Sequence, residues 1–345
     1  MQVEDGRRRV VVLSLGGTIA STRAAAEGQG RGVTPRLTAA DLVAAVPAVR
    51  EAAEVDSVSF RQCPSGDLTM TDLVELAAEV TARVEAGADG VVVTQGTDTL
   101  EETAFALDLL LPPSRPVVVT GAMRNPTLAG PDGPANLLAA VQVAACPQAA
   151  GLGCLVVLDD EIHGSRFVRK THTSSTGAFR SGPTGPLGWL TEGRPRIAVR
   201  PAPLPLITPL PGAAVPPVAL LTMSLGDDGR LAEQVLSLGY AGLVVQAFGG
   251  GHVPHRTVPA LERLAHTIPV VLASRTGAGE VLTDTYGFPG AEQDLIGRGL
   301  VPAGFLDGVK ARVLLSLALA AGLAAEQVRE VFARTAATVT GPPRR

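Results

Sequence analysis

The sequence alternates short, continuously apolar runs with longer stretches of helical spacing, and this alternation constrains the fold more than any other feature. Runs rich in β-branched residues that are apolar throughout are typical of strands buried on both faces of a parallel sheet. In the first half of the chain we predict strands at Val10–Leu15, Gly90–Thr94, Val117–Thr120 and Leu155–Leu158. We predict helices between them at Thr71–Glu85, Leu100–Leu111 and Pro134–Ala145, the last opened by Asp132 and Gly133. The pattern predicts an α/β fold with parallel-type sheets covered by helices.

A proline-rich segment at residues 196–217 interrupts the alternation. Proline lacks a backbone N–H, so this segment can continue neither a helix nor a central strand, and we predict an interdomain linker there. Because 345 residues exceed the usual size of one hydrophobic core, we expect a larger N-terminal α/β domain at 1–195 and a smaller C-terminal α/β domain at 218–345. The second domain should contain strands at Val218–Met223, Leu243–Ala247 and Pro269–Ala273 and a core helix at Asp307–Ala321.

The charge balance disfavours a nucleic-acid partner. The net charge is -4 at pH 7 and the pI is about 5.8, which leaves no basic stripe to neutralise phosphates. The three cysteines, Cys63, Cys146 and Cys154, and the five histidines lack metal-ligand spacing. We therefore expect no metal ion and no other cofactor.

The N-terminal segment indicates a cytoplasmic protein without a membrane partner. Arg7–Arg9 precede the apolar run Val10–Leu15, which is too short for the core of a signal peptide or for a membrane span. The odd number of cysteines fits thiols in a reducing compartment better than a disulfide framework.

Polar residues follow the predicted strands, at the edge where parallel sheets bind their ligands. After the first strand, Gly16 and Gly17 permit a tight turn that would expose the Thr18 hydroxyl. A threonine in such a place is more often a turn or capping residue, so this motif alone leaves both interpretations open.

The second strand is followed by Gly96, Thr97 and Asp98. A capping box of Thr99 with Glu102, or of Asp98 with Glu101, would explain part of this cluster as the start of the next helix. Capping does not require both Thr97 and Asp98 after a glycine that lets a ligand approach the backbone. A polar site is therefore at least as good an explanation.

Further polar residues follow the third and fourth strands, at Gly121–Arg124, at Asp159–Glu161 and at Lys170. A lysine in such a stretch is usually a surface cation, and Asp159–Glu161 is most simply a solvated acidic turn. If Lys170 were held near Thr97 and Asp98 and partly desolvated, it could lose its proton and act as a base.

Several of these segments together resemble the hallmark blocks of the bacterial L-asparaginase family. Their order and spacing match the family over nearly the whole chain, which makes the combination a strong signal. The blocks are Gly16–Ala20, Gly96–Ala104, Val119–Arg124, Asp132–Leu137 and Lys170-Thr171, with Gly239–Gly242 and Lys310–Leu315 in the second domain.

The resemblance implies an amidohydrolase in which Thr18 is the acylated nucleophile and Thr97, Asp98 and Lys170 form a second catalytic group beside it. Attack on the side-chain amide of L-asparagine would give a tetrahedral oxyanion, ammonia would leave, and water would hydrolyse the aspartyl ester. Backbone amides near Thr97 and Ala122 are candidate donors to that oxyanion. The implied substrate-binding residues are Gly17, Ser65, Gly66, Gly96, Thr97, Asp98 and Ala122.

The chain departs from the family pattern at two places. Ser65 stands where the family grips the substrate α-carboxylate, but the next residue, normally glutamine, is Gly66. We hypothesise that this loss alters discrimination between asparagine and glutamine. In the loop Gly28–Thr34, Gly32 stands where many members carry a tyrosine that helps to activate the nucleophile. The glycines of this loop still suit a mobile lid.

Family active sites are completed by a neighbouring subunit, which implies a homo-oligomer, either a dimer or a tetramer. We hypothesise that Glu280, Asp284 or Tyr286 is donated across that interface. Packing of Tyr286 within its own domain is an equal alternative. The loop Gly249–His252 either approaches the ligand or makes a tight turn.

Other functions remain open at this point. A glutaminase or another amidase of the same fold, including an ammonia-supplying amidotransferase subunit, would use similar residues. A non-catalytic amino-acid sensor would keep the pocket without turnover, and the missing tyrosine and glutamine leave that alternative open. Ammonia release from asparagine separates an enzyme from a sensor.

Overall fold

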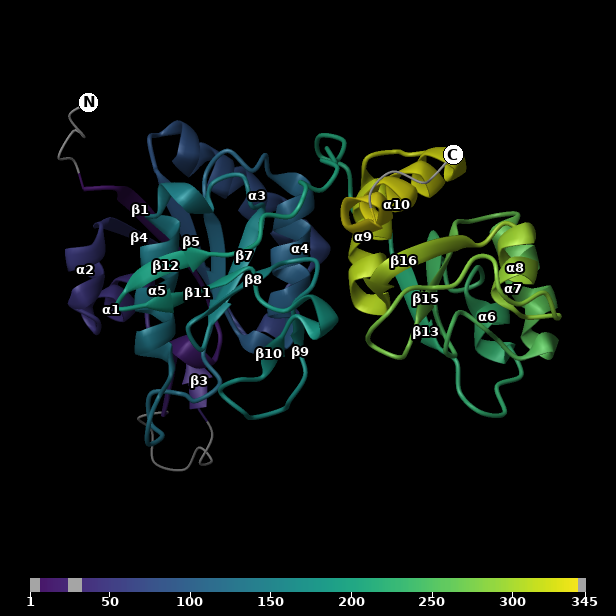
Figure 1. Cartoon of the computed structure of the whole chain (residues 1–345), viewed down its shortest axis with the longest axis horizontal. Helices are drawn as coiled ribbons and strands as arrows, with labels where there is room; N and C mark the ends of the chain where they lie inside the picture. Colours follow the sequence, from purple (N-terminus) through teal and green to yellow (C-terminus); the bar gives the residue numbers. More distant parts are fainter. Residues whose placement is uncertain (1–6, 24–32, 341–345) are drawn as a thin grey trace. The chain divides into compact units, whose positions relative to one another are not determined.

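The computed structural model describes residues 7–23 and 33–340 (Figure 1). The chain divides into two compact units between residues 203 and 204. The last strand of the first unit, β12 (Arg194–Ile197), runs two residues into the segment predicted as linker. This strand lies at the edge of its sheet, where a proline such as Pro195 is tolerated. The predicted domain boundaries at 195 and 217 stay predictions.

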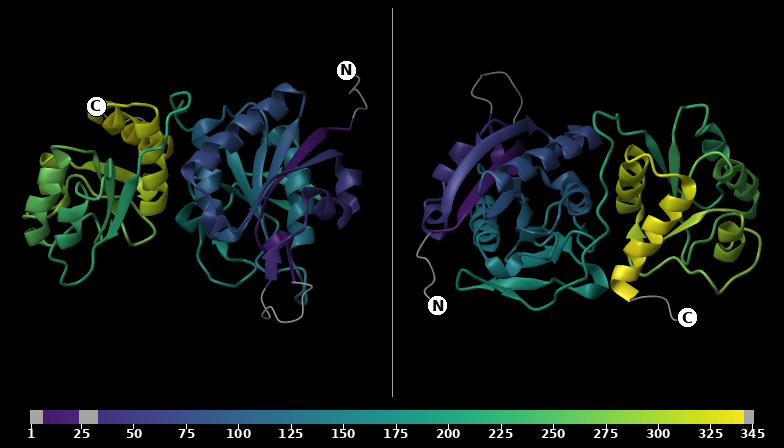
Figure 2. Two further views of the ribbon diagram at one scale, coloured as in Figure 1. Left: turned by 180° about the vertical axis from the view of Figure 1, so that it is seen from behind. Right: turned by 90° about the horizontal axis from the view of Figure 1, so that it is seen from above.

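The first unit is built on an eight-stranded sheet in the order β12-β11-β8-β7-β6-β5-β1-β4. Figure 2 shows the ribbon of this unit from two further sides. The five strands from β7 to β4 in this order run parallel to one another, whereas β8, β11 and β12 are added antiparallel. The parallel strands are β1 (Arg9–Gly16), β4 (Glu54–Cys63), β5 (Gly90–Thr94), β6 (Val117–Thr120) and β7 (Cys154–Leu158). Besides β12, the antiparallel strands are β8 (Glu161–Gly164) and β11 (Gly188–Thr191).

Helices cover both faces of this sheet, because successive residues of its central strands point to opposite sides. Val10 and Val12 of β1 pack into one buried cluster with α5, and Val11 and Leu13 pack into the other with α3 and α4. The longer helices are α3 (Met70–Glu85), α4 (Leu100–Leu110) and α5 (Gly133–Ala144), and the shorter ones are α1 (Ala39–Ala44) and α2 (Ala48–Ala52). Two small hairpins complete the unit, namely β2 (Ser21–Arg23) with β3 (Val33–Pro35), and β9 (Arg169–Lys170) with β10 (Phe179–Arg180).

The second unit has a four-stranded parallel sheet in the order β13-β14-β15-β16. Its strands are β13 (Val218–Thr222), β14 (Gly242–Ala247), β15 (Val270–Ser274) and β16 (Val301–Asp307). Its helices are α6 (Arg230–Gln234), α7 (Val258–Ala265), α8 (Glu292–Gly297), α9 (Gly308–Ala320) and α10 (Ala325–Thr340). The predicted two-unit α/β architecture is confirmed. Within residues 7–23 and 33–340, no helix combines the length and the apolar character that crossing a membrane requires.

Candidate active site

The turns that follow β1 and β5 touch through their backbones. A Cβ atom added to Gly17 would lie 2.0 Å from the backbone nitrogen of Gly96, so this contact has room only for glycine. Gly17 also has a φ of +81°, in the left-handed region that favours glycine. Thr18 and Thr97 each follow one of these glycines, so the two threonine-bearing turns lie together at one end of the sheet.

Thr18 begins a short 3-10 helix, Thr18–Ala20, whose other residues are buried. Thr18 itself is half-buried and keeps access to solvent. The Ser21 hydroxyl donates to the Gly17 carbonyl oxygen at 2.8 Å and ties the turn together. The position of the Thr18 backbone is therefore fixed by its neighbours.

Lys170 reaches the turn after β5 with its amino group. Its Nζ donates to Thr97 Oγ1 at 2.9 Å and to Asp98 Oδ1 at 2.6 Å. The Lys170 side chain is only 16% exposed, whereas the Asp98 side chain is 79% exposed. Lys170 is thus not an ordinary surface cation, and the structure brings Thr97, Asp98 and Lys170 into one hydrogen-bonded group.

Ser65, which follows strand β4, lies beside the turn that carries Thr97 and Asp98. A Cβ atom on Gly96 would lie 2.8 Å from Ser65 Oγ, which places the serine hydroxyl directly beside the turn after β5. The Thr99 hydroxyl donates to the Ser65 carbonyl oxygen at 2.9 Å. Helix α4 therefore begins without a side-chain cap, and the capping alternative for Thr99 is wrong.

The β9–β10 hairpin that carries Lys170 is fastened to the rest of the unit on two sides. The backbone N–H of Lys170 donates to a carboxylate oxygen of Glu101 at 2.6 Å. Ser181, directly after β10, has its hydroxyl oxygen 2.8 Å from Nδ1 of the buried His163. Burial and the nearby Arg180 lower the pKa of His163 to about 4, so its ring is neutral at pH 7. The sequence indicated Glu101 only as a capping partner of Asp98 and gave no role to His163, because neither residue belongs to a spacing pattern that signals a contact with Lys170.

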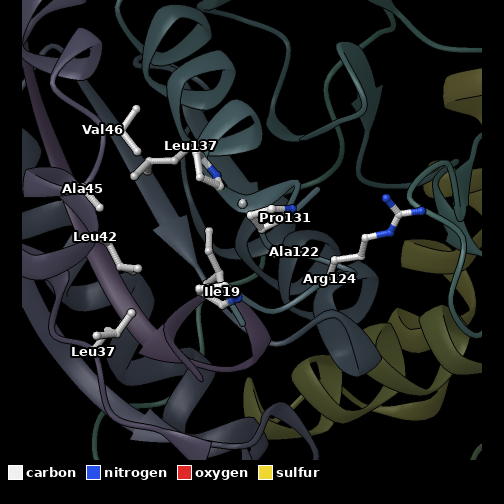
Figure 3. A pocket seen from close by; sticks show the side chains of 12 residues that line it. Ile19, Leu37, Leu42, Ala45, Val46, Ala122, Arg124, Pro131 and Leu137 are labelled. Atoms are coloured by element: carbon white, nitrogen blue, oxygen red, sulfur yellow. The ribbon is translucent and has the colours of Figure 1, made fainter. Parts of the chain in front are cut away.

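The turn after β6 also lies against Thr97. A Cβ atom on Gly121 would lie 3.1 Å from the Thr97 methyl carbon and 2.7 Å from the Gln95 carbonyl oxygen. Ala122 is fully buried, and its side chain lines an apolar cavity of about 100 Å³ together with Ile19 and Leu137. Figure 3 shows these side chains around the cavity, with that of Arg124 extending away from them.

Two family models account for nearly all of the described chain. The model "Asparaginase, N-terminal" matches residues 9–203 and the model "Glutaminase/Asparaginase C-terminal domain" matches residues 217–332. The chain belongs to the asparaginase family.

Individual asparaginases are similar to the chain over most of its length. A "Probable L-asparaginase" of Deinococcus radiodurans is 40% identical and covers 94% of this chain and 97% of its own. A "Glutaminase-asparaginase" of Acinetobacter glutaminasificans is 32% identical, and the match covers 94% of this chain and 99% of that protein. The solved structure of a "Probable Cytoplasmic L-asparaginase" from Campylobacter jejuni superimposes with a TM-score of 0.84 at 30% identity, covering 95% of this chain and 100% of that one.

The sequence departs from the asparaginase pattern at Gly66 and at Gly32. Gly66 is exposed, and among the described residues no atom lies within 4 Å of a Cβ added there, so the position has room for a side chain. Gly32, where many asparaginases carry a tyrosine, lies outside the described residues.

The asparaginase residues expected to act across subunits lie in the second unit. Glu280 and Asp284 are exposed, and Tyr286 is 45% exposed with its ring 5.0 Å from that of His252. The buried Glu292 carboxylate accepts hydrogen bonds from the backbone of Tyr286 at 2.6 Å and from His252 at 3.1 Å. Tyr286 is therefore held against its own unit while its outer half remains open to solvent.

The tight-turn interpretation of the glycine loop Gly249–His252 is supported by a bridge between Phe248 and His252. Asp159 and Asp160 form the turn of the β7–β8 hairpin, with φ of +54° and +58°. Within residues 7–23 and 33–340, no group of three or more His, Cys, Asp or Glu side chains could hold a metal ion.

Proposed function

We propose that this asparaginase-family chain hydrolyses L-asparagine to L-aspartate and ammonia through an acyl intermediate on Thr18. Family membership makes it an amidohydrolase. The observation that carries the proposal is the hydrogen-bonded group of Thr97, Asp98 and Lys170 next to the Gly17–Gly96 contact. Ammonia release from L-asparagine by the purified chain, and its loss in a Thr18→Ala variant, test the proposal.

In the proposed reaction the Thr18 hydroxyl attacks the side-chain carbonyl of asparagine while a base takes its proton. The base passes this proton to the amide nitrogen as the tetrahedral intermediate collapses, so that ammonia leaves. Water then attacks the ester, which releases aspartate and regenerates Thr18. Transfer of the proton by a positioned group contributes on the order of 10²- to 10⁴-fold in rate, and a donor to the oxyanion contributes a comparable factor. In this proposal the amino group of Lys170 is the base, and its contact with Thr97 holds it at the site. The exposed Asp98 carboxylate also holds the substrate α-ammonium group.

The opening at Gly66 favours a second candidate activity, hydrolysis of glutamine. With the α-carboxylate held by Ser65 and no side chain at position 66, a longer ligand can shift until its amide reaches Thr18. The similarity to a protein named for both amides supports the same idea. A sensor without turnover would release no ammonia from either amide.

Replacing Gly66 with glutamine is expected to raise the kcat/KM ratio of asparagine over glutamine by about tenfold, because a second hydrogen bond fixes the α-carboxylate. Both amides are assayed by ammonia release. The control is Asp67→Gln, which adds the same side chain at the next exposed position. A ratio that is unchanged in Gly66→Gln, or a wild-type preference like that of other asparaginases, would contradict the hypothesis.

We further propose that the chain forms a dimer or a tetramer in which the second unit of a neighbouring subunit completes the site. Tyr286 best fits this role because it is half exposed and its backbone is fixed by Glu292. Its hydroxyl would replace that of the lid tyrosine that is absent at Gly32. We also propose a cytoplasmic location, which the three free cysteines Cys63, Cys146 and Cys154 support.

Tyr286→Phe is expected to lower kcat about tenfold or more, because a positioned proton donor or acceptor is lost. Mixed oligomers of Thr18→Ala and Tyr286→Phe chains should regain about a quarter of the wild-type activity, since each mixed pair contains one intact site. As a control, Thr18→Ala chains are mixed with chains carrying both substitutions. Unchanged turnover in Tyr286→Phe excludes the tyrosine, and failure to regain activity on mixing places its action within one chain.

A further inference from the structure

Asp132 occupies the N-cap position of α5 but does not cap this helix with its side chain. One carboxylate oxygen accepts the backbone N–H of Met123 at 3.0 Å, and the other accepts that of Arg124 at 2.8 Å. Asp132, which precedes α5, therefore holds the backbone of the turn after β6.

Asn136, one turn further along α5, is buried and uses both ends of its carboxamide. Its Nδ2 donates to the Gly121 carbonyl oxygen at 3.0 Å and to Asp132 Oδ2 at 3.1 Å. Its Oδ1 accepts the backbone N–H of Asp159 at 3.1 Å. A carbonyl can only accept and an N–H can only donate, so these partners fix which end of the amide faces which turn. One buried side chain thus joins the ends of β6 and β7.

These contacts fix the two peptide groups on either side of Ala122. All described peptides are trans, and in a trans peptide the C=O and the N–H point in opposite directions. Because the Gly121 carbonyl points at Asn136, the Ala122 N–H points away from it. Because the Met123 N–H points at Asp132, the Ala122 carbonyl points away from Asp132.

This arrangement leaves the backbone N–H and C=O of Ala122 available for hydrogen bonds to a ligand. Within the part of the chain that the structure describes, neither its N–H nor its C=O has a hydrogen-bond partner. The Ala122 methyl group lines the apolar cavity beside Ile19 (Figure 3). It therefore does not cover the N–H and C=O groups of its own backbone. The preceding Gly121 lies against the Thr97 methyl carbon, which places this peptide at the proposed reaction site.

We propose that Asn136, supported by Asp132, is a positioning residue that orients the backbone of Ala122 toward the reacting amide. The inference rests on the proposed asparaginase reaction. An oriented backbone dipole stabilises the charge that develops in the transition state without having to reorganise, so its orientation affects kcat more than substrate binding.

The test compares Asn136→Asp with the wild-type chain. The aspartate keeps the shape and the oxygen that accepts the Asp159 N–H, but it has no donor for the Gly121 carbonyl. We expect kcat for asparagine to fall at least about tenfold while KM changes less than about threefold. Asn136→Ser removes the carboxamide and its contacts with Gly121, Asp132 and Asp159 without adding a charge. It gives the same readout if Asn136→Asp does not fold.

Val143→Ala is the matched control, because Val143 is fully buried on the same helix but lies away from the turn after β6. It should lower the melting temperature and leave kcat unchanged. A folded Asn136 variant with kcat within about threefold of wild type would overturn the proposal, as would an equal loss of kcat in Val143→Ala.

A crystal structure of the Asn136→Asp variant tests the same point without an activity assay. We expect the Gly121–Ala122 peptide to be rotated from its wild-type orientation, and an unchanged peptide would overturn the proposal. A rotated peptide in a chain whose wild-type form releases no ammonia from asparagine would contradict the proposed function alone.

Discussion

Replacing Thr18 with alanine is expected to lower ammonia release from L-asparagine by on the order of 10⁴-fold or more, because the proposed acyl intermediate forms on the Thr18 hydroxyl. Thr18 lies half-buried at the start of a 3-10 helix whose neighbours are buried, so loss of the hydroxyl should leave the turn intact. The measurement is kcat for ammonia release, with the melting temperature as the check on folding.

Thr18→Ser is the matched variant for this experiment. It keeps a hydroxyl at the same place, so its turnover should be clearly higher than that of Thr18→Ala. Binding of L-aspartate should persist in Thr18→Ala, since Ser65 and Asp98 remain. Turnover by Thr18→Ala within about tenfold of wild type would exclude Thr18 as the nucleophile.

Lys170→Met is expected to lower kcat by about 10²- to 10⁴-fold, which is the usual contribution of a positioned base. Methionine has a similar length but has no amino group to contact Thr97 Oγ1 and Asp98 Oδ1. The β9–β10 hairpin should persist, because Glu101 binds the backbone of Lys170 and not its side chain. The variant is measured by ammonia release over a range of pH.

Lys170→Arg distinguishes a base from a fixed positive charge. Arginine keeps the charge but does not lose its proton in proteins. If Lys170 accepts the proton of the nucleophile, Lys170→Arg should be as inactive as Lys170→Met. Recovery of kcat in Lys170→Arg would indicate an electrostatic role, and a kcat within about threefold of wild type in Lys170→Met would exclude either role.

The central strands β1, β5, β6 and β7 could be predicted from the sequence because both of their faces are buried, which makes their runs continuously apolar. Strand β4 was not predicted, because none of its residues is fully buried and its few apolar residues, Val55, Val58 and Phe60, form neither a continuous run nor a regular alternation. Strand β16 was not predicted either, since Pro302 and Gly304 interrupt its apolar pattern.

Part of the candidate site could be predicted in the same way, because Thr18, Thr97 and Asp98 follow strands that were predicted. The contact of Lys170 with Thr97 spans 73 positions and two helices, so periodicity carries no information about it. It was expected from the family resemblance alone. The roles proposed for Asp132 and Asn136 were not predicted, because a polar residue at the start of a helix has an ordinary explanation there.

The backbone contact between Gly17 and Gly96 limits how the enzyme could be redesigned. Even an alanine at position 17 would overlap the main chain of position 96, and neither turn can retreat without displacing the threonine that follows it. Attempts to reshape substrate choice at these two positions would therefore disrupt the geometry of the proposed active site before they changed selectivity. The open position at Gly66 tolerates new side chains without that conflict.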